Sequence, residues 1–121
     1  MYDYNGNGNG DGDGDESMTY TCPVCGFDEL DEPAYNEFND PSFEICSCCR
    51  FQFGDDDDVE IEEGLFMQRE ETHAMYRQAW IAKGTPIFMP EYYPKQFQLD
   101  GAVTKEHLIE QLKNIRIFED Q

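Results

Sequence analysis

Two matched pairs of cysteines constrain the fold of this chain more than any other feature. The pairs lie in the segments T-C-P-V-C-G-F, residues 21–27, and I-C-S-C-C-R-F, residues 45–51. A C-x-x-C turn lets two sulfurs reach one ion, and two such turns that face each other give tetrahedral coordination by four thiolates. The sequence therefore predicts a metal centre, and a folded unit around it whose stability depends on the metal.

The second segment holds three cysteines, and its alignment with the first segment indicates which of them bind the metal. The predicted metal ligands are Cys22, Cys25, Cys46 and Cys49. In this register Cys48 takes the place of Val24, which predicts a small apolar filler, with a reactive thiol as the alternative. A rival assignment uses Cys48 together with Cys49, although adjacent residues seldom present both side chains to one ion.

The residue after each C-x-x-C pair is expected to need a positive φ. Glycine adopts that conformation freely, and Gly26 stands there in the first turn. Arg50 stands there in the second turn, where a left-handed backbone would cost about 1 kcal/mol. Its cation would also lie beside a centre that carries net negative charge when zinc holds four thiolates.

The four thiolates suit zinc, and they also suit iron, because both accept tetrahedral sulfur coordination. A site closed by four cysteines leaves no position for water, which favours a structural role over a catalytic one. The N-terminus lacks the basic region and the apolar core of a secretory signal. Paired thiols without such a signal are typical of a reducing compartment, so we expect a cytoplasmic protein.

Charge limits the partners of this chain. With 27 acidic against 8 basic residues, the net charge is −19. Such a polyanion repels nucleic acid and anionic membranes, whereas it would attract and steer a basic protein partner. The alternative is that acidity only keeps the protein soluble. The run D-D-D-D at 55–58 is expected to lie at the N-terminus of a helix, with a cation site or a partner-facing patch as alternatives.

Composition divides the chain into a tail and a single domain of the α+β class. Residues 1–17 are rich in Gly, Asn and Asp and are expected to be disordered, although their spacing of oxygen-bearing side chains also resembles a calcium loop. Residues 18–121 form the domain, in which a small zinc-ribbon-like unit of short strands, 18–54, packs against two helices in a helical half, 55–121. The connector 87–94 is broken by proline.

Alternation of residue types predicts strands at 19–21, 43–45 and 51–53. Helical periodicity runs through residues 59–83, and Gly84 ends it. A second helix is expected to follow Thr104 as its N-cap, with an apolar stripe that packs on the domain or, alternatively, binds a partner. We expect these large side chains to join the two halves: Trp80, Phe51, Phe53 and Phe66.

The segments C-P-V-C-G-F and P-S-F-E-I-C-S-C-C-R-F-Q-F-G-D-D-D resemble the cysteine-rich CPCC-type domains of bacteria. That family is similar to zinc ribbons and largely lacks an assigned activity. Y-R-Q-A-W-I-A-K-G-T-P-I-F, residues 76–88, is a weaker likeness to related small bacterial proteins. The resemblance implies metal ligands at the four matched cysteines, and Arg50 departs from the glycine usual at its position. A looser likeness to rubredoxins, which also pair two C-x-x-C-G turns, implies an iron centre.

Three functions follow from these features. The first is an acidic, metal-stapled binding protein that neutralises or regulates a basic partner, as immunity proteins do. The second is electron transfer by a four-cysteine iron, and the third is an enzyme. We expect no enzyme, because His73 and His107 are the only histidines and each is predicted to be a surface or capping residue of a helix. A structural domain of another role is the remaining alternative.

Overall fold

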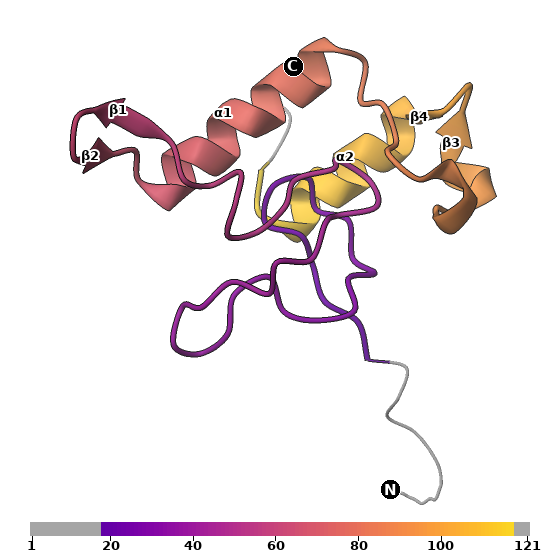
Figure 1. The fold of residues 1–121 in the computed structure, drawn as a ribbon. Helices are drawn as coiled ribbons and strands as arrows, with labels where there is room; N and C mark the ends of the chain where they lie inside the picture. The colour runs from indigo at the N-terminus through magenta and orange to yellow at the C-terminus, as the bar shows by residue number, and fades with distance from the viewer. Residues whose placement is uncertain (1–17, 118–121) are drawn as a thin grey trace, which may run out of the picture.

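The computed structural model describes residues 18–117, and the predicted tail of residues 1–17, with its calcium alternative, lies outside them. The secondary structure is mixed, as the α+β prediction requires (Figure 1). The elements are β1 Glu60–Glu62, β2 Leu65–Phe66, α1 Arg69–Ala82, the short 3-10 helices η1 Pro90–Tyr92 and η2 Lys95–Phe97, β3 Gln98–Leu99, β4 Ala102–Val103 and α2 Lys105–Asn114. β1 pairs with β2 and β3 with β4, each antiparallel.

The cysteine-containing segment contains fewer strands than predicted. Tyr20 and Ile45 each make only a single bridge, to Leu30 and Gln52, in place of the expected strands 19–21, 43–45 and 51–53. Phe43 has a φ of 64°, which an extended strand does not allow. The backbone groups next to the cysteines are instead used in tight turns, so the loops are shaped by the turns and not by a sheet.

The first helix begins later than the periodicity predicts, because a hairpin occupies the start of that segment. β1 and β2 are joined at Glu63 and Gly64, and Gly64 has a φ of 79°. A left-handed glycine ends helical periodicity and permits a tight turn. Helix α1 then runs from Arg69, ends at Ala82 and is followed by Gly84 with a φ of 96°, which confirms the predicted stop.

The prediction for the second helix is correct. Thr104 is its N-cap, and its side chain accepts a hydrogen bond from the backbone N–H of His107 at 3.2 Å. A hairpin that we did not predict precedes it, turning at Asp100 and Gly101, with φ of 56° and 79°. Two positive φ values in succession are typical of an Asp-Gly hairpin turn, so this dipeptide could have predicted the hairpin from the sequence.

The hydrophobic core connects the cysteine loops with the helices. The cysteine loops lie below α1 in Figure 1 and contact both helices. Trp80, Phe51 and Phe53 are buried in this core, as expected. Phe66 is 50% exposed because it lies in the β1–β2 hairpin, so its assignment to the junction was wrong. Within residues 18–117, no helix is long and apolar enough to cross a membrane.

Candidate metal centre

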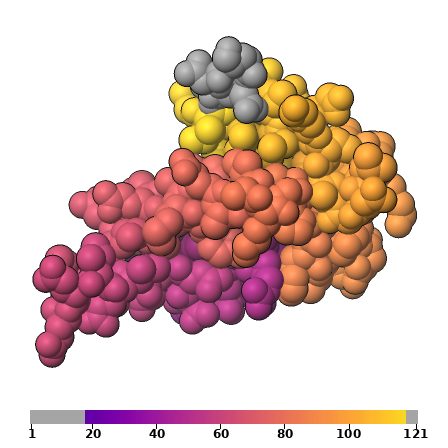
Figure 2. All heavy atoms as spheres, turned by 90° about the horizontal axis from the view of Figure 1, so that it is seen from above, coloured from indigo at the N-terminus to yellow at the C-terminus, as the bar shows by residue number. Residues whose placement is uncertain are grey.

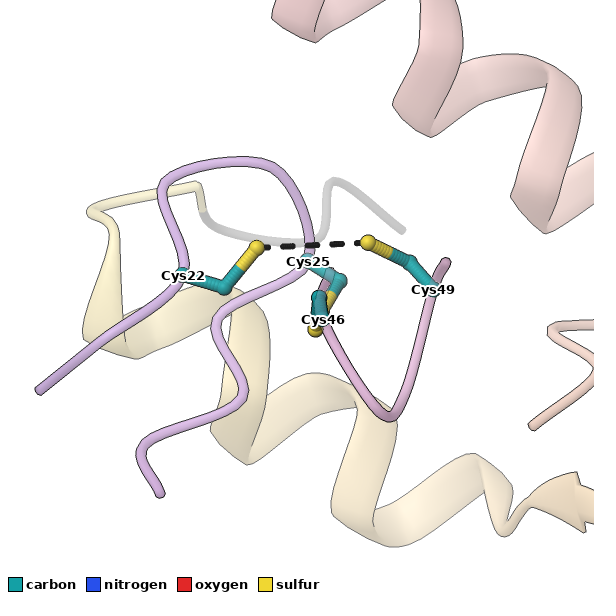
Figure 3. A group of neighbouring side chains, drawn as sticks. All are labelled: Cys22, Cys25, Cys46 and Cys49. Atoms are coloured by element: carbon teal, nitrogen blue, oxygen red, sulfur yellow. Dashed lines mark hydrogen bonds between the residues drawn. The ribbon is translucent and has the colours of Figure 1, made fainter. Parts of the chain in front are cut away.

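The structure brings four cysteine sulfurs together between two loops. One ligand atom from each of Cys22, Cys25, Cys46 and Cys49 lies within 4.8 Å of all the others. Figure 3 shows the first pair on one loop and the second pair on the other. The sulfurs of Cys22 and Cys49 are 3.9 Å apart, and those of Cys25 and Cys46 are 3.7 Å apart.

These separations match a metal tetrahedron and not a disulfide. With zinc–sulfur bonds of about 2.3 Å, the edge of a tetrahedron is about 3.8 Å long. A disulfide needs sulfurs about 2.05 Å apart, and all five cysteines are free thiols here. The donor set therefore fits one tetrahedral ion, and the four residues would supply all of its ligands.

The two loops have the same backbone hydrogen bonds, position by position. We call residues 22–27 the first cysteine turn and residues 46–51 the second. In the first, Val24 N–H donates to the Cys22 sulfur, and in the second, Cys48 N–H donates to the Cys46 sulfur, each at 3.4 Å. N–H donors of this kind spread the negative charge of a thiolate, which prepares the sulfurs for a cation.

The closing bonds of the turns correspond as well. Gly26 N–H donates to the Cys22 carbonyl and Arg50 N–H to the Cys46 carbonyl, both at 2.9 Å. Gly26 has a φ of 84° and Arg50 a φ of 75°, so both turns need the left-handed backbone that we expected. The alignment of the two segments in the sequence is thus an alignment of their structures.

Burial and hydrogen bonds between the thiols together shift their pKa values. Desolvation raises the pKa of Cys25 and of Cys49 well above the ordinary value. Burial alone would also raise the pKa of Cys46, but hydrogen bonds from Cys22 and Cys25 outweigh it and lower that pKa. A buried thiolate loses its hydration, so four of them in one place require a cation. Metal binding at this centre should therefore release protons.

Helix α1 holds both turns through side chains that donate to backbone carbonyls. Tyr76 donates to the carbonyl of Cys49 at 2.9 Å. Arg77 donates through Nε to the carbonyl of Val24 at 2.6 Å and through a terminal nitrogen to that of Pro23 at 3.3 Å. Since these carbonyls belong to turns with no sheet partner, the helix satisfies them and fixes the position of the turns. Arg77 also brings positive charge to the thiolate cluster.

Helix α2 holds the first turn from another side. Gln111, only 2% exposed, donates to the carbonyl of Cys25 at 2.9 Å and accepts a hydrogen bond from the Tyr93 hydroxyl. Asn114 donates to the carbonyl of Gly26 at 3.0 Å. Gln111 could not be predicted from the sequence, because a buried glutamine and an exposed one look the same in a helical pattern defined by its apolar residues.

Gly26 has a second reason to be glycine. A Cβ atom built on it would lie 1.8 Å from the backbone oxygen of Gln111. Helix α2 thus packs directly on the backbone of the first turn. Arg50 is exposed in the second turn, and its guanidinium group lies over the ring of Phe88, 5.7 Å from the ring centre. This difference explains how one turn accepts a side chain that the other cannot.

Cys48 lies outside the group of four sulfurs. It is fully buried at the position equivalent to Val24, and the amide of Gln111 approaches its sulfur to 3.8 Å. Full burial excludes oxidants and electrophiles from its thiol. Its placement supports the filler role among the alternatives that the sequence left open.

The run D-D-D-D does not lie at a helix N-terminus, so that expectation was wrong. It belongs to a turn before the β1–β2 hairpin, whereas the first turn of α1 carries Glu70 and Glu71. Asp56 accepts a hydrogen bond from the backbone N–H of Gln52 at 2.9 Å, and Asp57 accepts one from that of Gly54 at 3.0 Å. Two of the four carboxylates therefore fix the local backbone.

His73 is also placed differently from the prediction, since it is a buried residue of α1. Its Nε2 lies 2.9 Å from the hydroxyl of Tyr35, and that hydroxyl donates to Asp57 at 2.5 Å. Because the hydroxyl donates to the carboxylate, the histidine is the donor to the hydroxyl. Burial lowers the pKa of His73 to about 4, against the opposing charge of Asp57, so the imidazole is neutral at physiological pH. The half-buried His107 stacks on Phe97.

Three proteins of Bacillus subtilis (strain 168) are similar to this chain over most of its length. YhgB is 32% identical over 104 residues, which cover 83% of this chain and 96% of YhgB. YoaQ is 30% identical over 103 residues, which cover 81% of this chain and 87% of YoaQ. YozI is 27% identical over 104 residues, which cover 81% and 86%. Each is described as an uncharacterized protein. No family model and no solved structure matches the chain.

Proposed function

The chain belongs to the family of the Bacillus subtilis proteins YoaQ and YhgB, and we propose that it is an acidic, metal-stapled binding protein for a basic protein partner. In this proposal Cys22, Cys25, Cys46 and Cys49 hold a structural zinc ion. The matched turns support a CPCC-type, zinc-ribbon-like unit. Five free thiols suit a reducing cytoplasm.

The metal is assigned a structural role because its ligands are complete and enclosed. Three of the four cysteines are fully buried and the fourth is 3% exposed. Four protein ligands close a tetrahedral site, so no position remains for water or substrate. Iron in the same ligands would instead support electron transfer, and visible absorption distinguishes the two ions.

The main support for the binding role is the exposed surface of the β1–β2 hairpin. It projects from the body of the molecule (Figure 2). Ile61, Leu65 and Phe66 are 55%, 54% and 50% exposed on it. The hairpin also carries three exposed carboxylates, those of Glu60, Glu62 and Glu63. A projecting arm that combines half-exposed apolar side chains with carboxylates complements a partner surface that is apolar and rimmed by cations.

The binding role is tested with the full chain, loaded with zinc, as bait for cell extract. We expect basic proteins to be retained at about 50 mM salt and largely released at about 500 mM, because the attraction is screened. The double variant Ile61→Ser, Phe66→Ser should lose them, whereas Leu99→Ser, which changes a 70% exposed leucine of β3, should keep them. Retention of the same proteins by the hairpin variant would refute the assignment of the hairpin.

A further inference from the structure

A pocket that lies between the second cysteine turn and helix α1 has no role in the function proposed above. Its volume is about 300 Å³, at the lower end of the range for sites that bind small molecules. Tyr76, Trp80 and Phe88 contribute aromatic walls, and Ala79 leaves room between them. The pocket shares no lining residue with the β1–β2 hairpin, so the two can be tested by separate variants.

The aromatic walls present carbon to the pocket because their polar atoms are already used, with Phe88 39% exposed and Trp80 only 3% exposed. The indole N–H of Trp80 donates to the carbonyl of Pro86 at 2.9 Å, and the hydroxyl of Tyr76 donates to that of Cys49. The backbone of Phe88 is fixed as well, since its N–H donates to the carbonyl of Cys48 at 3.0 Å. The walls are therefore held in place before any ligand arrives, and they favour a flat apolar body.

Two exposed cations lie at this pocket, in a chain where acidic residues outnumber basic residues by more than three to one. Arg50 and Lys83 are among its lining residues, and within residues 18–117 neither forms an ion pair. Asp55 and Asp56 line a neighbouring hollow that shares Arg50 and Phe88 with this pocket, but they are not among the residues that line the pocket itself. Positive charge next to aromatic walls selects a ligand that combines a ring with an anionic group.

We propose that this pocket binds a small organic anion in which a carboxylate is attached to an aromatic ring. The ring lies among Tyr76, Trp80 and Phe88, and the carboxylate meets Arg50 and Lys83. In this arrangement the second cysteine turn places a cation at the pocket, because Arg50 stands at the left-handed position where the first cysteine turn has glycine.

Trp80 provides the assay, since it is the chain's only tryptophan and lines the pocket. The zinc-loaded full chain is titrated with benzoate, with the neutral benzamide and with acetate, and the fluorescence of Trp80 is recorded. We expect a saturable change with benzoate, with a midpoint on the order of 1 mM. Benzamide should bind about tenfold more weakly, and acetate should cause no saturable change.

Variants separate binding in the pocket from non-specific quenching. Lys83→Met and Arg50→Gly should each raise the midpoint for benzoate about tenfold, and Ala79→Phe should abolish saturation by filling the pocket. Lys105→Met, at an exposed position of α2, is the matched control and should leave the midpoint unchanged. Zinc content and circular dichroism verify that each variant is folded. Equal midpoints for benzoate and benzamide, or a Lys83→Met midpoint equal to that of the wild type, would overturn the proposal.

Discussion

Replacement of Gly26 by alanine tests how the first cysteine turn is attached to helix α2. The substitution adds one methyl group at a residue with a φ of 84°. The new Cβ would meet the backbone oxygen of Gln111 at 1.8 Å and its carbonyl carbon at 2.4 Å. Both neighbours are backbone atoms of a helix, so no side-chain rotation can relieve the contact.

The expected loss of stability has two parts. A left-handed backbone at alanine costs about 1–2 kcal/mol. Displacing a packed helix to admit a methyl group costs about 1–3 kcal/mol more. We therefore expect Gly26→Ala to lower the free energy of unfolding by roughly 2–5 kcal/mol. That is a large part of the stability of a small domain.

Gly84→Ala is the matched control. Gly84 has a φ of 96°, but a Cβ there meets nothing within 4 Å, so only the backbone part of the cost applies, about 1–2 kcal/mol. Both variants are unfolded with urea in the presence of equal free zinc, and their midpoints and slopes are compared with the wild type. Equal losses in the two variants would show that α2 does not pack on the turn as described.

Three further changes test the contacts around the centre. Tyr76→Phe removes the hydrogen bond to the carbonyl of Cys49, and urea unfolding should show a loss of about 1 kcal/mol. Gln111→Leu leaves a buried carbonyl and the Tyr93 hydroxyl without a partner, so we expect the free energy of unfolding to fall by about 2–3 kcal/mol. Glu110→Leu, at an exposed position of the same helix, is the control and should lower it by less than about 0.5 kcal/mol. Equal losses in the two variants would contradict this role of Gln111. The pKa of His73 is lowered to about 4 in the folded chain, so the unfolded chain takes up the proton first as the pH falls from 6.5 towards 4, and stability is lost in that window. Allowing for partial solvation, this loss is about 1–2 kcal/mol, and His73→Gln, which keeps the donor without titrating, should not show it in unfolding curves at pH 7 and pH 5.

The sequence predicted the features that depend on local chemistry. The register of the two cysteine turns, the positive φ after each pair, the cap at Thr104 and the stop at Gly84 are all determined by a few adjacent residues. Each of these appears in the structure. Whether the four cysteines bind metal, and which metal, stays a prediction.

The features that depend on distant contacts were not predictable in this way. The hairpin at residues 60–66 has apolar residues at spacings that also fit a helix, and only the left-handed turn at Gly64 separates the two. The burial of His73 and Gln111 follows from partners that are far away in the sequence, Tyr35 and Cys25. A pattern of residue types along one helix cannot show which polar groups another segment will satisfy.

The metal content of five single-cysteine variants tests the central claim most directly. Each cysteine is replaced by serine in the full chain, and zinc and iron are measured per chain after purification and desalting. We predict one zinc ion per chain in the wild type and in Cys48→Ser. The other four variants should lose most of it: Cys22→Ser, Cys25→Ser, Cys46→Ser and Cys49→Ser. Retention of metal in any of these four, or its loss in Cys48→Ser, would contradict the four-cysteine centre.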